Sequence, residues 1–283
     1  MKKKSDKCLI VDKLINEGWF QDEKEVQSWI MLKRILVNDQ LIYSSSEKVP
    51  NNCIIRVKEY YKRKYTNKGG LKLEGALKDF NIDVTNLVAL DCGASTGGFT
   101  DCLLYYGAQM VYAVDVGHGQ LAGKLLINEK VRNLENTNLS NELLKALNPL
   151  PEIITLDLSY LSLKIAVPIC FDILKNQGVI ICLVKPIYEV ESHEIRRNGK
   201  INDNKIIREI LFDLSEYFIK LGCNIIGITN SPVKGNNDTL EYFIGLTIGN
   251  ASINNINNEI KSHIEVSLKK SQEITSFKKN EYY

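Results

Sequence analysis

A carboxylate and an amine each follow an apolar run of the chain, a placement that suits acid–base chemistry. Asp157 comes directly after residues 153–156, and Lys185 comes directly after residues 179–184. A charged group at the end of a buried strand is unfavourable unless it is paired or used in a reaction. A lysine beside a carboxylate can position a hydroxyl group and support the loss of its proton. We therefore interpret both residues as candidate catalytic groups.

A glycine-rich turn follows a third apolar run, residues 87–90. It begins at Asp91, contains three glycines within residues 93–98, and leads into a helical pattern from Phe99 to Tyr106. Such a turn lets the backbone approach a ligand closely at a helix N-terminus, where free N–H groups point outward. The dinucleotide pattern G-x-G-x-x-G and the phosphate-loop ending G-K-[ST] are both missing from it. The turn predicts a nucleotide-type cofactor pocket.

This turn resembles the first motif of S-adenosylmethionine-dependent methyltransferases, in which an acidic residue ends the first strand and the glycines pack against the methionine moiety. The next apolar run, residues 110–114, ends in Asp115, where that class places the carboxylate that accepts the ribose hydroxyls. Asn138 is a candidate contact to adenine, or alternatively a cap for a helix around Leu143. The implied cofactor-binding residues are Asp91, Gly93, Ala94, Ser95, Thr96, Gly97, Gly98, Phe99, Asp115 and Asn138.

Separated segments, in one order along nearly the whole chain, resemble the TlyA family of ribosomal RNA 2′-O-methyltransferases, whose catalytic fold is that of the FtsJ RNA methyltransferases. The segments are residues 69–77, 91–101, 114–121, 135–138, 157–160, 183–186 and 231–235. The resemblance implies a catalytic tetrad of Lys72, Asp157, Lys185 and Glu241. In it Lys185 lies next to the attacking oxygen, Asp157 orients Lys185, and the other two hold the ribose. It also implies S-adenosylmethionine as cofactor, ribosomal RNA or a ribosomal subunit as partner, and cytidine as the acceptor.

Three other functions compete with this interpretation. An amino-methyltransferase usually has two prolines and an aromatic residue after the acidic or amide residue of this motif, whereas here the sequence is Asp157-Leu158-Ser159-Tyr160. A non-catalytic RNA-binding or ribosome-assembly factor would not need the complete tetrad. A membrane-damaging activity is disfavoured, although members of the family have been labelled hemolysins, because we find no signal peptide, membrane span or strongly amphipathic basic helix.

Composition indicates a globular protein of the cytoplasm. The 283 residues exceed the usual size of one domain, so one large or two unequal domains are expected. The seven cysteines form no C-x-x-C pair and suggest reduced thiols. The three histidines show no ligand spacing, so we predict no metal. The sequence makes no prediction about oligomeric state.

Basic charge is concentrated near the N-terminus. Residues 1–72 contain 16 Lys and Arg against 9 Asp and Glu, whereas the rest of the chain contains 20 against 25. Such a region is either a solvated face or a docking surface for RNA phosphates. A helix, a second helix capped by Asp22, and two short β runs around Asn38-Asp39 follow in order.

This order resembles the small RNA-binding module named after ribosomal protein S-four, although two arginines common in that module are missing, at residues 10–12 and 22–23. A small helical cap on the larger domain is the alternative. Residues 59–70 interleave tyrosines with basic residues and could stack on bases or form an exposed linker. The candidate RNA-binding residues are Lys24, Lys33, Arg34, Lys62, Arg63, Lys64 and Lys68.

The remaining pattern predicts an α/β fold with a Rossmann-like methyltransferase sheet, mainly parallel, with an antiparallel pair at one edge. Expected strands cover residues 88–91, 110–116, 152–157, 178–184, 224–229 and 242–248, with a further one at 131–134. Helices are expected at 163–174 and 206–221 and from Ile256 to Leu268. The expected domains are a small α+β RNA-binding domain (1–58), a linker (59–70), the methyltransferase domain (71–250) and a C-terminal helix with a polar tail (251–283). Ligands in such sheets bind at the carboxyl ends of the strands.

Overall fold

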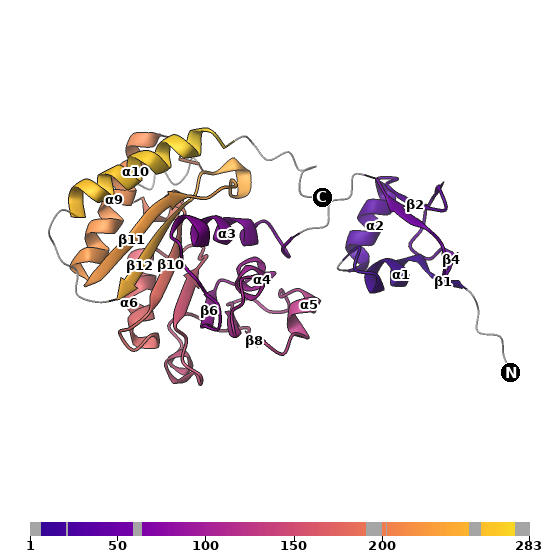
Figure 1. Ribbon diagram of the computed structural model, residues 1–283, viewed down its shortest axis with the longest axis horizontal. Helices are drawn as coiled ribbons and strands as arrows, with labels where there is room; N and C mark the ends of the chain where they lie inside the picture. Colours follow the sequence, from indigo (N-terminus) through magenta and orange to yellow (C-terminus); the bar gives the residue numbers. More distant parts are fainter. Residues whose placement is uncertain are drawn as a thin grey trace. The chain divides into compact units, whose positions relative to one another are not determined.

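The computed structural model describes residues 7–20, 22–58, 64–190, 200–201, 203–248 and 256–274. The chain divides into two compact units between Lys64 and Tyr65, within the segment expected to be a linker (Figure 1). The six residues 65–70, which were assigned to the linker from the sequence, belong to the larger unit. The linker is therefore shorter at its C-terminal end than we expected.

The smaller unit has its own apolar core and contains the two predicted helices and the predicted β hairpin, together with two strands that were not predicted, β1 (Lys7–Leu9) and β4 (Lys48–Pro50). The other elements are α1 (Ile10–Asn16), α2 (Glu23–Met31), β2 (Ile35–Val37), β3 (Gln40–Leu41) and β5 (Ile55–Val57). β1 pairs with β4, and β2 lies between β3 and β5. Asp22 caps α2 by accepting a hydrogen bond from the backbone N–H of Glu25 at 2.8 Å, as predicted. Ile10, Leu14 and Val26 are fully buried in the core.

The larger unit is built around a seven-stranded sheet in the order β11-β12-β10-β9-β6-β7-β8. β12 runs antiparallel to both of its neighbours, and the other pairs are parallel, which confirms the predicted sheet. The strands are β6 (Val88–Cys92), β7 (Met110–Val114), β8 (Val131–Leu134), β9 (Ile153–Leu156), β10 (Val179–Val184), β11 (Cys223–Asn230) and β12 (Tyr242–Ile248).

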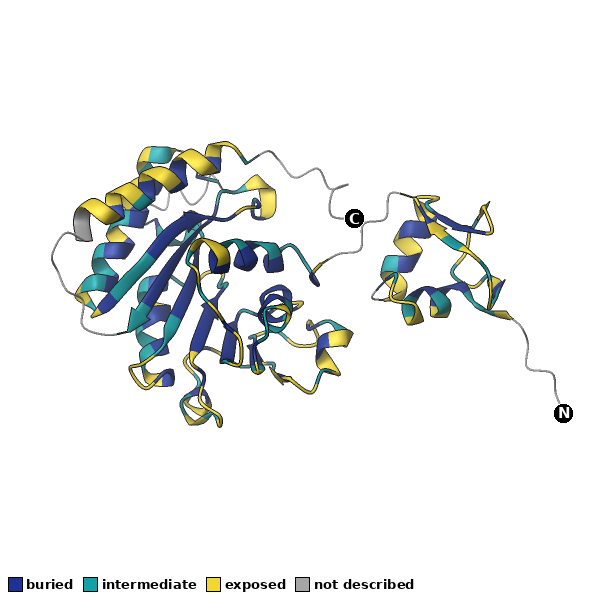
Figure 2. Ribbon diagram, in the orientation of Figure 1, coloured by how far each residue is buried: buried dark blue, intermediate teal, exposed yellow. Residues whose placement is uncertain are grey.

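Helices cover both faces of this sheet. α3 (Gly69–Asp79) and α4 (Gly98–Tyr105) pack together on one face, and α6 (Leu163–Ile173), α9 (Asn204–Lys220) and α10 (Ile256–Gln272) pack against the other. The shorter helical segments are α5 (Gly123–Leu126), η1 (Glu142–Ala146), α7 (Pro186–Glu189) and η2 (Asn236–Asp238). Figure 2 shows the central strands buried along most of their length. Burial on both faces explains why these strands are nearly continuous apolar runs in the sequence.

The strand order places the predicted functional segments side by side. β10, β9, β6 and β7 are consecutive neighbours in the parallel part of the sheet. Lys185, Asp157, Gly93 and Asp115 each lie just beyond the carboxyl end of one of these strands. Because parallel strands have their carboxyl ends at the same edge, these residues lie in one row above the sheet.

Candidate functional site

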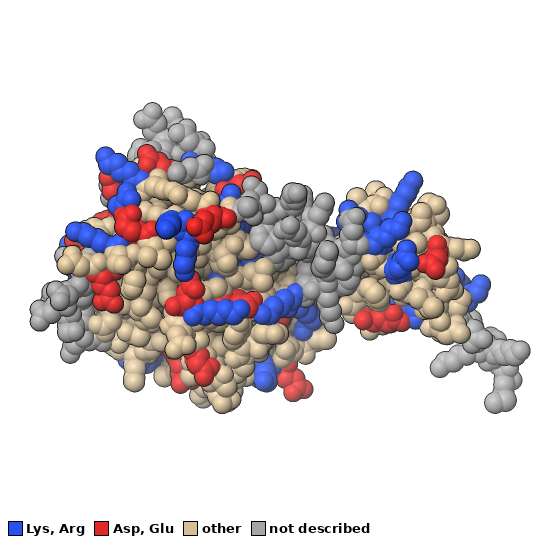
Figure 3. Space-filling model, turned by 45° about the horizontal axis from the view of Figure 1, so that its top comes forward, with Lys and Arg blue, Asp and Glu red and all other residues tan. Residues whose placement is uncertain are grey.

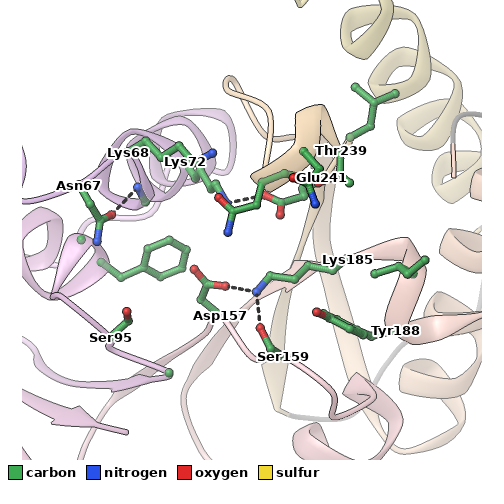
Figure 4. A pocket seen from close by; sticks show the side chains of 18 of the residues that line it. Asn67, Lys68, Lys72, Ser95, Asp157, Ser159, Lys185, Tyr188, Thr239 and Glu241 are labelled. Atoms are coloured by element: carbon green, nitrogen blue, oxygen red, sulfur yellow. Dashed lines mark hydrogen bonds and ion pairs between the residues drawn. The ribbon is translucent and has the colours of Figure 1, made fainter. Parts of the chain in front are cut away.

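A cavity of about 560 Å³ opens at this edge of the sheet (Figure 4). Six segments contribute to its wall: the start of α3, the glycine turn after β6, the residues following β9, following β10 and preceding β12, and Ile201 before α9. The four residues of the predicted tetrad, Lys72, Asp157, Lys185 and Glu241, all line it. The fold therefore brings together side chains separated by up to 169 positions in the sequence.

Lys185 and Asp157 form an ion pair inside the cavity. The Lys185 Nζ lies 2.6 Å from the Asp157 Oδ1 and donates a hydrogen bond to the Ser159 Oγ at 3.3 Å. Their side chains are 17% and 23% exposed, so both remain accessible to a ligand. The amine is thus held by two neighbours from the loop after β9.

A second ion pair, Lys72 with Glu241, is nearly closed off from solvent. The Lys72 Nζ lies 2.5 Å from the Glu241 Oε2, and the side chains are 7% and 6% exposed. Glu241 immediately precedes β12 and packs against Gly235, where an added Cβ would lie 2.2 Å from the Glu241 Oε1. Two lysines and two carboxylates therefore line one cavity as paired charges.

The backbone of the glycine turn lies very close to the backbone at Asp157. Gly93 has φ +84°, and a Cβ on it would lie 2.3 Å from the backbone oxygen of Asp157. Gly97 has φ +96° and precedes α4. Glycine is needed at both positions because a side chain would clash or strain the backbone. The turn and the candidate catalytic carboxylate are consequently fixed to each other.

Asp91 lies beneath the turn and not in the cavity wall. It is fully buried, and its carboxylate accepts hydrogen bonds from the hydroxyls of Thr100 at 2.7 Å and Thr155 at 3.1 Å. Burial raises the pKa of Asp91 to about 7, while these hydrogen bonds oppose the shift. Asp91 therefore supports the turn from below in this structure.

The other predicted cofactor residues divide into two groups. Gly93, Ala94, Ser95, Gly98 and Phe99 line the cavity. Asp115, Thr96, Gly97 and Asn138 are not among its lining residues. The Asp115 carboxylate accepts hydrogen bonds from the backbone N–H groups of Ser95 at 2.8 Å and Gly117 at 2.7 Å, which ties the turn to the end of β7. Asn138 accepts hydrogen bonds from Ser140, and Asn141 is the residue that caps the helical turn at Leu143.

Lys68 points inward, although we expected it to contact RNA phosphates. Its Nζ donates hydrogen bonds to the backbone oxygens of Lys234 at 3.2 Å and Gly235 at 2.9 Å, and it lines the cavity. Burial lowers the pKa of Lys68, and the nearby positive charge of Lys72 lowers it further. The carbonyl groups of a loop distant in sequence draw this side chain into the site.

The segment before α3 is bonded to the glycine turn and to α4. The Thr66 backbone N–H and hydroxyl both donate to the Asp101 Oδ2, at 2.7 and 2.8 Å. The Asn67 side chain donates to the Thr96 Oγ1 at 2.6 Å and accepts from the Gly69 N–H. Asn67 was missing from our predicted site, although asparagine is common at helix starts and here it lies one position before Lys68, the residue that precedes α3.

Other cavity residues also went unpredicted. Ser159, Tyr188 and Thr239 line the wall and flank predicted residues. Ser159 and Tyr188 each lie within three positions of Asp157 or Lys185. Their nearness to a predicted strand end could therefore have identified them as part of the site.

The other candidate RNA-binding residues that the structure describes are not among those lining the cavity. Lys24 and Lys33 are exposed on the smaller unit, and the Arg34 guanidinium carbon lies 5.5 Å from the centre of the Trp29 ring. Lys64 is exposed, whereas Lys62 and Arg63 fall outside the described residues. Figure 3 shows Lys and Arg side chains on both units, interspersed with acidic side chains.

The described residues contain neither a candidate metal site nor a candidate membrane-spanning helix. Among the residues that the structure describes, no cluster of three or more His, Cys, Asp or Glu side chains could hold a metal ion. Within the same part of the chain, none of the helices combines the length and the apolar character required to cross a membrane.

Known methyltransferases and proteins named hemolysins resemble this chain in sequence, and one solved structure also resembles it in fold. The profile of the FtsJ-like methyltransferases matches residues 65–248. Hemolysin A of Brachyspira hyodysenteriae is 36% identical over 80% of this chain and 94% of its own length. The 16S/23S rRNA (cytidine-2′-O)-methyltransferase TlyA of Mycobacterium tuberculosis is 30% identical over 82% of this chain and 87% of its own. A solved structure named "Putative hemolysin from Streptococcus thermophilus" is 30% identical, with a TM-score of 0.69 over 95% of this chain and 98% of that one.

Proposed function

Because the chain belongs to the FtsJ-like methyltransferase family, we propose that it transfers a methyl group from S-adenosylmethionine to a ribose 2′-hydroxyl of ribosomal RNA. The relative from Mycobacterium tuberculosis is named for this reaction on cytidine, and we extend cytidine to this chain as the acceptor. The observation that carries the proposal is the pair of lysine–carboxylate contacts, Lys185–Asp157 and Lys72–Glu241, on one cavity beside the glycine turn.

The residues around the turn fit an S-adenosylmethionine cofactor. Gly93, Ala94 and Gly98 line the cavity and carry no side chain larger than a methyl group, so the backbone of the turn can lie close to a ligand there. The first turn of α4 begins at Gly98, and N–H groups in a first helical turn have no acceptor within the helix. We propose that these donors and Asp115 hold the cofactor, which when bound supplies an electrophilic sulfonium methyl group.

The acid–base residues suit activation of a hydroxyl group. A ribose hydroxyl is a weak nucleophile while protonated, so it needs positioning and support for its departing proton. We assign Lys185 to the attacking oxygen, where its ammonium stabilises the negative charge that develops. Asp157 and Ser159 fix the direction of that ammonium. Lys72 and Glu241 then hold the ribose at the opposite wall.

We propose that the smaller unit recognises the RNA. Its basic residues Lys24 and Lys33 are exposed, and phosphate contacts add salt-dependent affinity in RNA-binding proteins. We propose that this unit docks on ribosomal RNA in the manner of an S-four module, so that the acceptor is presented in a folded RNA or a whole ribosomal subunit.

The proposal is tested with purified protein, tritiated S-adenosylmethionine and isolated small and large ribosomal subunits. The unaltered protein should transfer label to RNA, and alkaline hydrolysis should leave the labelled nucleotide in a resistant dinucleotide because a 2′-O-methyl group blocks cleavage. Lys185→Ala should abolish transfer. Lys220→Ala, which alters a lysine that is 77% exposed on α9, is the matched control and should be fully active. Transfer that survives Lys185→Ala, or label on a base, would reject the mechanism.

A further inference from the structure

Two tyrosines lie together at the edge of the cavity beside Lys185. Tyr188 belongs to α7 and lines the cavity next to Ser159 (Figure 4). Tyr160 follows Ser159 in the loop after β9. The ring centroids of Tyr160 and Tyr188 are 5.2 Å apart, with an interplanar angle of 49°. The loops that carry the two candidate catalytic charges therefore also contribute two adjoining aromatic rings, which together we call the aromatic surface.

Tyr160 combines an exposed ring with a left-handed backbone conformation. It is 88% exposed, so its ring gains little from burial. Its φ is +67°, in the left-handed region that a bulky residue rarely adopts. Strained backbone of this kind concentrates at functional sites, where the surrounding structure maintains it. The exposed ring is therefore open to contact with a ligand.

The two loops are held together independently of the rings. Glu189, the last residue of α7, accepts hydrogen bonds from the Ser162 hydroxyl at 2.7 Å and from the Leu163 backbone N–H at 3.0 Å. These bonds connect the residue after Tyr188 to the start of α6, just beyond Tyr160. Together with the Lys185–Asp157 ion pair, they fix the aromatic surface relative to the charges.

We propose that Tyr160 and Tyr188 form a stacking platform for the base of the nucleotide whose ribose is methylated. The proposal rests on the function proposed above. The base is attached to the sugar carbon next to the one that bears the 2′-hydroxyl, so a hydroxyl at Lys185 brings its base to this rim. Unpaired RNA bases commonly stack on aromatic side chains, which hold them by their faces.

The position of the platform in the sheet favours the RNA over the cofactor as its occupant. Tyr160 and Tyr188 follow β9 and β10, whereas the glycine turn and Asp115 follow β6 and β7. In the strand order β10-β9-β6-β7, the platform and Asp115 are at opposite ends of the row. A cofactor held by the turn and Asp115 therefore extends away from the two rings.

Four variants test this platform in the full-length protein: Tyr160→Leu, Tyr160→Phe, Tyr160→Gly and the control Lys175→Gly. Lys175 is exposed, lies outside the cavity and has φ +53°, so glycine relieves a comparable strain there. Methyl transfer to ribosomal subunits gives KM and kcat, calorimetry gives the Kd for S-adenosylmethionine, and thermal melting gives Tm.

We expect Tyr160→Leu and Tyr160→Gly to raise the KM for subunits about 5- to 150-fold, the range that corresponds to the loss of stacking on one base. Tyr160→Phe should keep the KM of the unaltered protein. Both glycine variants should melt no lower than the unaltered protein, and all four should bind S-adenosylmethionine normally. This combination distinguishes a lost RNA contact from a damaged fold.

Three results would overturn the platform while leaving the proposed function intact: an unchanged KM in Tyr160→Leu, an equal loss in Tyr160→Phe, or a weakened affinity for S-adenosylmethionine. If the unaltered protein transfers no methyl group to ribosomal RNA, the proposed function is itself refuted and the platform with it.

Discussion

Changes to the buried pair Lys72–Glu241 should affect the stability of the larger unit and its methyl transfer differently. The two atoms are 2.5 Å apart and both side chains are under 10% exposed. At an effective dielectric constant of about 20 their attraction is about 7 kcal/mol, and it is offset by a desolvation penalty of several kcal/mol for each ion. Removing one partner leaves a buried charge alone, which destabilises proteins by about 3–5 kcal/mol.

We therefore expect Lys72→Met and Glu241→Leu each to destabilise the larger unit by about 3–5 kcal/mol, which lowers Tm by about 10 °C in a domain of this size. The double variant Lys72→Met/Glu241→Leu removes both charges and should regain most of the stability. All three should lose methyl transfer, because both residues belong to the proposed tetrad.

The assay is urea unfolding followed by circular dichroism, with methyl transfer to ribosomal subunits measured in parallel. The matched control is Lys220→Met, since Lys220 is 77% exposed and 3.8 Å from Glu216. Its removal should change stability by no more than about 1 kcal/mol. If the double variant loses as much free energy of unfolding as the two single variants added together, an unpaired buried charge is not the cause of the instability. The same conclusion follows if the single variants are as stable as the control.

Three further predictions concern single residues around the site. Gly235→Ala should sharply reduce methyl transfer, because the new Cβ would displace the Glu241 carboxylate, whereas the backbone φ of −67° is one that alanine adopts readily. Methyl-transfer kinetics should show the loss, and the circular dichroism spectrum should stay unchanged. Glu189→Gln keeps the size of the side chain but weakens its bonds to the Ser162 region, so we expect a lower kcat with an unchanged Kd for S-adenosylmethionine, and an unchanged kcat would contradict the bracing role. Asp91 has a pKa raised from 3.8 to about 7 in the folded state, so its contribution to stability is present below about pH 4 and is lost as the pH rises through 7. The stability of the unaltered protein relative to Asp91→Asn should fall across that interval by roughly 4 kcal/mol, and a difference independent of pH would show that the carboxyl titrates normally.

Much of the sheet could be predicted because burial on both faces leaves apolar runs that end abruptly at polar residues. Asp157 and Lys185 were recognisable for this reason, since each follows such a run. Their spatial meeting then follows from neighbouring parallel strands. The family resemblance added Lys72 and Glu241, neither of which ends a long apolar run, and the structure brings both to the same cavity.

Features that depend on long-range contacts escaped prediction. Lys68 lies in a basic stretch, and only the carbonyls of residues 234 and 235 reveal that it points inward. Asp91 has the motif position of a cofactor residue, yet two threonine hydroxyls from different elements hold it in the core. The contact of Tyr160 with Tyr188 joins two loops and requires a backbone conformation that the sequence does not indicate.

The contacts of Tyr65 and Thr66 determine where an autonomous catalytic fragment has to begin. The Tyr65 ring is almost fully buried and lies so close to Gly70 that a Cβ there would be 2.3 Å from it, and Thr66 makes two hydrogen bonds to Asp101. A truncation at Gly69, the first residue of α3, would delete these anchors and expose an apolar hollow. A truncation just before Tyr65 would preserve them, so the first residue of the helix is a poor guide to the limit of independent folding.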